Sequence, residues 1–186
     1  MTLHLVPVKS VQDQEKLAEL AGQIWREYWP AHIGAAQTEY MIEHFQSLEA
    51  IKRQMAFEDY EYWFAFADEE DLDDDAAKAS PWGRLVGFTG GHNEPETNRF
   101  FISKIYLLDS ARGHGFARRI INFYDALCQT RDFDAMYLTV NKYNDLGTRA
   151  YFGTGFKIVD AVETDIGGGF IMDDYIMQKE AGQPIS

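Results

Sequence analysis

A strand, a turn with two glycines, a helix and a second strand follow one another between residues 98 and 140. Residues 98–108 and 136–140 have the apolar content of strands. Residues 115–131 place apolar side chains on one helical face, at Ala117, Ile120, Ile121, Tyr124, Leu127 and Cys128. Two strands that are joined through a helix lie parallel in one sheet, with a right-handed crossover. This unit therefore predicts a sheet covered by helices.

The rest of the chain supplies further elements of both kinds. Strand patterns cover residues 2–9, 60–67, 84–91, 156–164 and 170–178, and Gly167 to Gly169 form the turn between the last two strands. Helical patterns run from the N-cap residue Ser10 to Pro30, over 35–55 with a break at Ser47, and over 144–153. We therefore expect a single α/β (α+β) domain over residues 1–180. Its mixed central sheet has about seven strands and is flanked by about four helices. Residues 181–186 form a flexible tail.

Composition excludes several classes of function. A formal net charge of -13 argues against a nucleic-acid partner, because phosphate backbones attract stripes of Lys and Arg. Residues 68–75 carry much of this charge, either as a solvated loop or as a loop that steers a cationic acceptor. The one cysteine, Cys128, excludes a disulfide framework, and no apolar run is long enough to span a membrane. We expect a cytoplasmic protein that is not bound to a membrane.

The turn between the first of these parallel strands and its helix reads Arg112-Gly113-His114-Gly115-Phe116-Ala117. Two glycines let consecutive backbone N–H groups point at one anion, and the N-terminus of the helix adds partial positive charge. The sequence lacks the third glycine of the dinucleotide fingerprint and the Gly-Lys-Ser/Thr of a Walker loop. Taken alone, the pattern fits either a tight turn or a phosphate-binding turn.

Two consecutive motifs decide between these alternatives. Ile105 to Leu108 followed by R-G-H-G-F-A resembles the coenzyme-A motif of the GNAT superfamily of N-acetyltransferases. Further along, Leu138-Thr139-Val140, Asn144, Ala150-Tyr151-Phe152 and Gly155-Phe156 are similar to that family's second motif. The resemblance covers roughly residues 84–178. It implies a GNAT-like fold in which a splayed pair of parallel strands holds acetyl-coenzyme A as co-substrate.

The resemblance also implies which residues bind this co-substrate. The backbone of Ile105, Tyr106 and Leu107 would pair with pantetheine, and an amide there would polarise the thioester carbonyl. The phosphates would lie on the turn formed by Arg112, Gly113, His114, Gly115, Phe116 and Ala117.

Asn144 and Tyr151 each have two interpretations. Asn144 matches the position whose side chain hydrogen-bonds pantetheine, and it also fits the N-cap of a helix. Tyr151 matches the general acid that protonates the departing thiolate, whereas its neighbour Phe152 suggests simple packing against the sheet. We expect Tyr151 to be catalytic.

The sequence does not identify the general base that deprotonates the acceptor amine. Many relatives carry a glutamate where this sequence has Ser103, which cannot take a proton from an amine. His92, Glu94 and Glu96 are alternatives at the end of the preceding strand. The spacing of the histidines and the single cysteine matches no metal site, so we expect none.

For the acceptor, the aromatic segment around Tyr28 and Trp29 forms either a cage for an alkylammonium group or part of the core. The segment Phe101–Leu108, together with Met172-Asp173-Asp174-Tyr175, looks most like the bacterial polyamine (spermidine/spermine) N-acetyltransferase branch. We expect transfer to a primary amine of a small molecule, with a polyamine as one candidate. A coenzyme-A-binding module without catalysis and a protein N-terminal acetyltransferase are the alternatives. A homodimer is compatible with the sequence.

Overall fold

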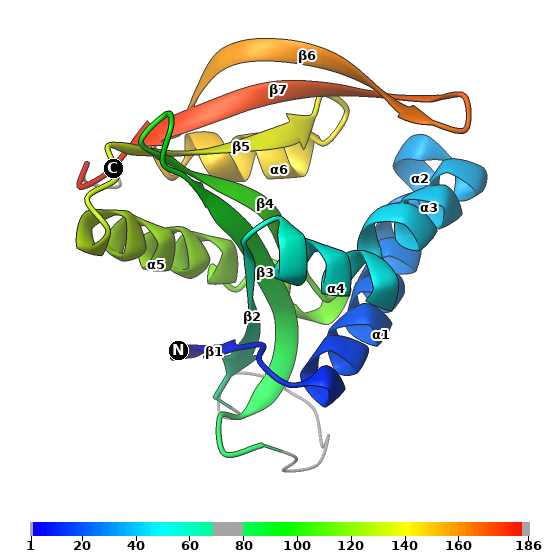
Figure 1. Ribbon diagram of the computed structural model, residues 1–186, viewed down its shortest axis with the longest axis horizontal. Helices are drawn as coiled ribbons and strands as arrows, with labels where there is room; N and C mark the ends of the chain where they lie inside the picture. The colour runs from blue at the N-terminus through cyan, green and yellow to red at the C-terminus, as the bar shows by residue number, and fades with distance from the viewer. Residues whose placement is uncertain (1, 69–79, 184–186) are drawn as a thin grey trace.

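The computed structural model describes residues 2–68 and 80–183. Figure 1 shows a twisted sheet with helices on both faces. The strands are β1 (Leu3–Pro7), β2 (Tyr60–Ala67), β3 (Arg84–Glu94), β4 (Arg99–Leu107), β5 (Ala135–Asn141), β6 (Lys157–Gly167) and β7 (Phe170–Glu180). The helices are α1 (Val11–Tyr28), α2 (Pro30–Ile33), α3 (Ala35–Met41), α4 (Leu48–Phe57), α5 (Phe116–Thr130) and α6 (Asp145–Phe152), with a π-turn, η1 (Ile42–Gln46), and a 3-10 turn, η3 (Asp109–Ala111).

The seven strands form one sheet in the order β1-β2-β3-β4-β5-β7-β6. The pair β4 and β5 is parallel, as the crossover predicted, and every other neighbouring pair is antiparallel. Pairing of β4 with β5 extends only from Arg99 to Ile102 on β4, and from Ala135 to Leu138 on β5. Beyond these residues the two strands separate, as the resemblance implied.

A bulge in β4 lies where the strands separate. Gly90 of β3 is opposite Lys104 and Gly91 is opposite Ile102, so Ser103 is the extra residue. The bulge reverses the alternation of side chains. Ile102 belongs to the core beside α5, whereas Lys104 reaches the backbone of η1 on the other face.

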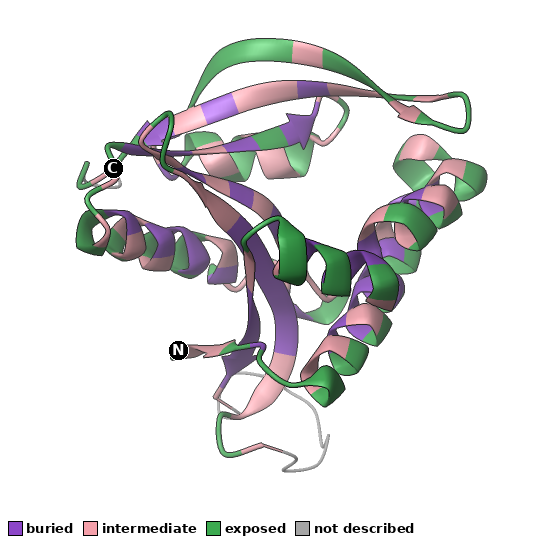
Figure 2. Cartoon of the chain, viewed as in Figure 1, coloured by how far each residue is buried: buried purple, intermediate pink, exposed green. Residues whose placement is uncertain are grey.

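Helices cover both faces of this sheet. One core cluster packs α5 residues such as Ile120 and Tyr124 against the strands, and another packs α1 residues such as Leu17 and Ile24 against the opposite face. Figure 2 shows the buried residues concentrated along the sheet and on the helix sides that face it. Cys128 is buried in the first cluster, consistent with a core role.

The helical count and several boundaries differ from the sequence prediction. Six α-helices are described instead of about four. Pro30 to Ile33 form a short helix of their own, and the stretch 35–55 divides into α3, η1 and α4. The division before α4 falls at Ser47, whose hydroxyl accepts a hydrogen bond from the N–H of Ala50, as expected of a cap. The strand predicted over 84–91 continues to Glu94.

Two other predicted segments lie partly outside the described residues. Positions 69–75 of the acidic stretch are not described, and neither are residues 184–186. At the C-terminal end, Ala181 N–H donates to Asp134 O and Gly182 N–H donates to Asp125 Oδ1, so residues 181 and 182 are held against the domain.

No helix in the described part of the chain is long and apolar enough to cross a membrane.

Candidate active site

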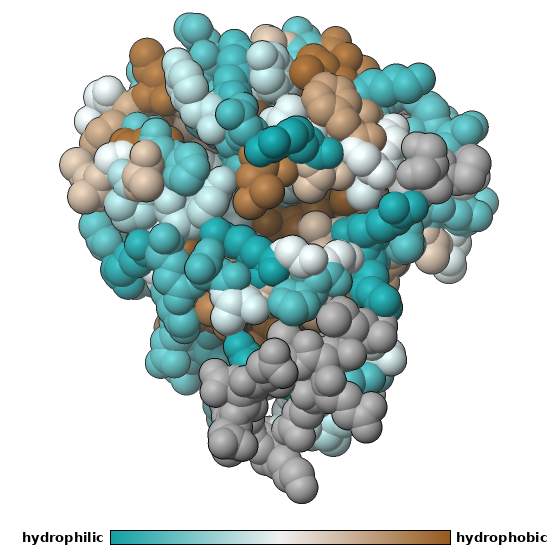
Figure 3. All heavy atoms as spheres, turned by 180° about the vertical axis from the view of Figure 1, so that it is seen from behind, coloured by the Kyte–Doolittle hydropathy of each residue, from teal (hydrophilic) through white to brown (hydrophobic). Residues whose placement is uncertain are grey.

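A cavity of about 640 Å³ opens where β4 and β5 separate. Its walls come from α1, β4, the glycine turn before α5, β5, α6 and β7. On the face seen in Figure 3, apolar surface lies in a hollow framed by hydrophilic side chains. The cavity therefore collects residues that are up to 150 positions apart in the sequence.

The glycine turn forms one end of the cavity. Gly113 and Gly115 have φ values of 81° and 75°, in the left-handed region that favours glycine. A Cβ built on either glycine meets nothing within 4 Å, so the space around the turn is open. No described group accepts a hydrogen bond from the backbone N–H groups of residues 113–117. These amides, at the N-terminus of α5, fit a phosphate group.

Other predicted residues of the turn have different surroundings. Arg112, Phe116 and Ala117 line the cavity, as does Arg118, which adds positive charge. Arg112 also donates to Leu107 O at 3.3 Å and to Asp109 Oδ1 at 3.2 Å. His114 is not among the lining residues, and its ring stacks on Phe116 with centroids 5.9 Å apart.

The open edge of β4 forms one wall. Ile105, Tyr106 and Leu107 line the cavity, and they lie beyond the last residue that pairs with β5. An unpaired strand edge can hydrogen-bond an extended ligand as a further strand would. The arrangement fits the amide groups of a pantetheine arm.

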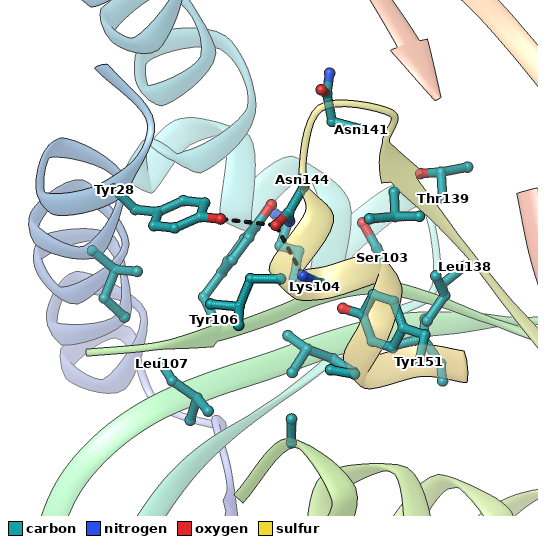
Figure 4. A pocket seen from close by; sticks show the side chains of 18 of the residues that line it. Tyr28, Ser103, Lys104, Tyr106, Leu107, Leu138, Thr139, Asn141, Asn144 and Tyr151 are labelled. Atoms are coloured by element: carbon teal, nitrogen blue, oxygen red, sulfur yellow. Dashed lines mark hydrogen bonds between the residues drawn. The ribbon is translucent and has the colours of Figure 1, made fainter. Parts of the chain in front are cut away.

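Tyr28 and Asn144 meet across the cavity. The Tyr28 hydroxyl donates to Asn144 Oδ1 at 2.8 Å, as Figure 4 shows. Asn144 Oδ1 also accepts from Gly147 N–H, so Asn144 caps α6 as one interpretation predicted. The Arg112 guanidinium lies over the Tyr28 ring, 4.3 Å from its centroid. Tyr28 therefore connects α1 to residues expected to bind coenzyme A.

Trp29 lies with Trp25 and Met41 in a small buried cluster. Its ring stacks on Trp25 with centroids 5.1 Å apart, and both rings line the cavity. The tip of the β6–β7 hairpin closes this end, where the Tyr40 hydroxyl donates to Ile166 O at 2.8 Å. This end of the cavity, beside Trp25, Trp29 and Met41, is therefore largely aromatic and apolar, and we call it the acceptor side because the sequence predicts the acceptor near Tyr28 and Trp29.

Tyr151, on α6, lines the cavity, and no described group hydrogen-bonds its hydroxyl. Burial, and to a lesser extent the neighbouring Tyr28, raise the pKa of Tyr151 to about 12. Its ring packs beside Phe156 with centroids 5.9 Å apart. Tyr151 is therefore protonated at neutral pH and positioned to donate toward the cavity.

The bases considered from the sequence lie elsewhere or are engaged. Ser103 lines the cavity and accepts a hydrogen bond from the Tyr60 hydroxyl at 3.0 Å. Glu94 accepts from the Tyr137 hydroxyl at 2.6 Å, and neither it, His92 nor Glu96 lines the cavity. Across residues 2–68 and 80–183, no group of three or more His, Cys, Asp or Glu could hold a metal ion.

The sequence analysis assigned no role in the site to two buried ionisable residues of the cavity. Asp174 of β7 is 5% exposed, and Lys104 of β4 is 4% exposed. Lys104 Nζ donates to Phe45 O and Gln54 Oε1 at 3.1 Å, and to the Tyr62 hydroxyl at 2.5 Å. Its three donors are thus satisfied. Burial is nevertheless the largest influence on Lys104, and it lowers the pKa to about 7 from an ordinary 10.5.

This lysine makes stability depend on pH. Between pH 7 and 10 the unfolded chain holds a proton on Lys104 that the folded chain releases, so the free energy of unfolding rises with pH. Lys104→Met should flatten this rise, and Tm measured from pH 7 to 9.5 would show it. Lys52→Met, at an exposed lysine, serves as the control and should keep the wild-type slope. Parallel curves for wild type and Lys104→Met would contradict a depressed pKa.

Comparison with known proteins agrees with this geometry. Residues 21–156 match the model of the acetyltransferase (GNAT) family. No curated protein sequence matches the chain.

Among solved structures, one similar to this chain is the PaiA N-acetyltransferase from Thermoplasma acidophilum in complex with coenzyme A. It has a TM-score of 0.71 and 22% sequence identity, and the match covers 97% of this chain and 99% of that chain. A GNAT-family acetyltransferase from Streptococcus pneumoniae has a TM-score of 0.64 at 14% identity, with 97% and 100% covered. Mutant forms of the spermidine/spermine N-acetyltransferase SpeG from Vibrio cholerae have a TM-score of 0.62 at 15% identity, with 97% and 95% covered.

These structures share the fold of this chain, and the family match spans both of its predicted motifs. The open glycine turn and the free edge of β4 fit the phosphates and the pantetheine arm of the family's co-substrate. The chain therefore belongs to the GNAT family of acetyltransferases, and it is an acyl-CoA-dependent N-acetyltransferase with acetyl-coenzyme A as co-substrate.

Proposed function

We propose that this enzyme transfers the acetyl group of acetyl-CoA directly to the primary amine of a small molecule. One observation carries the proposal. A single cavity contains the glycine turn, the free edge of β4, the Tyr151 hydroxyl and an apolar acceptor side. Both substrates can therefore meet in one space, and no acetylated enzyme is required.

Each part of the cavity has a proposed role. The N–H groups of residues 113–117, together with Arg112, bind the phosphates, and the edge formed by Ile105 to Leu107 binds pantetheine. A backbone amide of this edge polarises the thioester carbonyl, since donors preset where negative charge develops stabilise the transition state. Asn144 binds the pantetheine arm while it caps α6. Tyr151 protonates the departing thiolate.

The acceptor side supports a small molecule in particular. Trp25, Trp29 and Met41 are buried beneath it, and the β6–β7 hairpin closes over it against α3. Tyr28 and Trp29 supply aromatic faces that attract an alkylammonium group. A polyamine is one candidate acceptor, in keeping with the acidic net charge of -13.

A panel of free amines and short peptides tests the proposal, with release of the coenzyme-A thiol as the readout. The panel comprises 2-phenylethylamine, butylamine, spermidine and peptides with free N-termini. We expect turnover with at least one small amine. Turnover restricted to peptides would favour a protein N-terminal acetyltransferase. Coenzyme-A binding without any turnover would favour a binding module.

A further inference from the structure

Asp174 is an unpaired buried carboxylate that lines the cavity. The residue is 5% exposed, and its Oδ1 accepts no hydrogen bond from any described residue. Alternation along β7 places it on the same face as Met172, which packs into the acceptor-side cluster with Trp25 and Trp29. Its neighbour Asp173 faces the other way and forms an ion pair with Lys142 Nζ.

Asp174 differs in charge from the other ionised residues that line the cavity. Among the described lining residues, Asp174 is the one carboxylate in a protein of net charge -13. The cations are Lys104, Arg112, Arg118 and Arg149. The lining residues of α1 to α4 and η1 are all uncharged. A cationic acceptor that enters the cavity therefore meets a single negative group.

Burial and a neighbouring negative charge disfavour the ionised form of Asp174. Burial, and then Asp173, raise the pKa of Asp174 to about 6, while Lys142 opposes the shift. Burial is the main cause that raises the pKa of Tyr106 on β4, and Tyr151 and Asp174 lie close enough to raise it further. The carboxylate and the proposed general acid therefore lie near the same phenol. Burying a carboxylate without a partner costs free energy, which a bound ammonium group recovers.

We propose that Asp174 binds the ammonium group of the acceptor and accepts its proton before the amine attacks. This inference rests on the proposed function. The R–NH₃⁺ group gives one proton to the Asp174 carboxylate. The nitrogen lone pair then forms the C–N bond with the thioester carbonyl carbon, while the π pair of the C=O bond moves to the oxygen and gives a tetrahedral intermediate. When the C=O bond forms again and the C–S bond breaks, the thiolate takes a proton from Tyr151. The nitrogen loses its second proton, which restores Tyr151, and the proton on Asp174 passes to solvent.

The same geometry narrows the class of acceptor. One carboxylate beside an aromatic and apolar wall suits an amine with a single ammonium group and an apolar body. A second ammonium group of a polyamine would be desolvated here without a matching carboxylate, which is unfavourable. In the amine panel, 2-phenylethylamine should therefore have a higher kcat/KM than spermidine.

Asp174→Asn tests the role of the carboxylate, with Asp173→Asn as the matched control on the opposite face. With the best amine of the panel, Asp174→Asn should lower kcat/KM about 10- to 100-fold, as expected for a lost charged hydrogen bond. Affinity for coenzyme A should be unchanged, and Tm at pH 8 should be equal or higher because an unpaired buried charge is removed. Asp173→Asn should keep kcat/KM within about fivefold, as for a partly exposed ion pair.

The dependence of kcat/KM on pH distinguishes a role of Asp174 as proton acceptor from a purely structural role. Since Asp174 must be ionised to act, wild-type kcat/KM should fall as pH decreases through about 6, and Asp174→Asn should lack this fall. Wild-type activity with an unchanged profile in Asp174→Asn would overturn the inference.

If the wild-type enzyme turns over no amine, the proposed function fails, but the role of Asp174 in binding can still be tested. Calorimetric binding of 2-phenylethylamine to the wild-type and Asp174→Asn enzymes, each with coenzyme A bound, then decides the role of Asp174, and equal affinities would overturn it.

Discussion

Tyr151→Phe should lower kcat by about 10²- to 10⁴-fold, the usual contribution of general acid assistance. The hydroxyl reaches the cavity without a described partner, and a pKa of about 12 keeps its proton in place at neutral pH. The substitution removes one oxygen and preserves the ring that packs beside Phe156. Affinity for coenzyme A and Tm should therefore change little. The measurement is kcat under conditions where the chemical step limits the rate.

Tyr143→Phe is the matched control, because Tyr143 is 70% exposed and does not line the cavity. It should keep wild-type kcat. A Tyr151→Phe enzyme with nearly full kcat would show that water or another residue protonates the thiolate. A loss of Tm that parallels the loss of activity would favour the packing interpretation of Tyr151.

Gly115→Asp should weaken coenzyme-A binding by about 100-fold. Gly115 is the N-cap residue of α5, and a Cβ built on it meets nothing within 4 Å. A carboxylate at this point repels a phosphate group a few ångströms away by about 3 kcal/mol at an effective dielectric constant near 20, which corresponds to about 100-fold in Kd. Calorimetric titration with coenzyme A measures the change.

Gly115→Asn separates charge from backbone conformation. Asparagine has a similar shape, carries no charge and tolerates a positive φ better than most residues. We expect it to bind coenzyme A more weakly than wild type and clearly more tightly than Gly115→Asp. Equal affinities for the two variants would mean that phosphate does not bind near Gly115, and unchanged affinity in both would remove the turn from the binding site.

The elements that the sequence predicted well are those with a local physical cause. The Ser10 hydroxyl accepts from Asp13 N–H at 3.0 Å, as the N-cap pattern indicated. Gly167 to Gly169 all have positive φ, which fits the turn predicted between the last two strands. The glycines of the phosphate turn and the apolar face of α5 are also local patterns. Each depends on residues a few positions apart.

Lys104 and Asp174, to which the sequence analysis assigned no role in the site, reach the cavity through long-range strand pairing. Lys104 faces the acceptor side because the bulge at Ser103 reverses the alternation of β4, and no local pattern marks that bulge. Asp174 reaches the cavity because β7 inserts between β5 and β6, so that Asn141 is opposite Asp174. In the sequence, Asp174 is one of two adjacent aspartates, and nothing distinguishes the buried one from the paired one.

The most direct test of the account is to follow the acetyl group itself. The enzyme is incubated with acetyl-CoA that carries an isotope label in the acetyl group, together with the best amine of the panel. Mass spectrometry then identifies the labelled product, while thiol release is counted in the same sample. We predict one labelled N-acetyl amine for each thiol released, and no labelled enzyme. Thiol release that yields labelled acetate without labelled amine would contradict acetyl transfer to an amine.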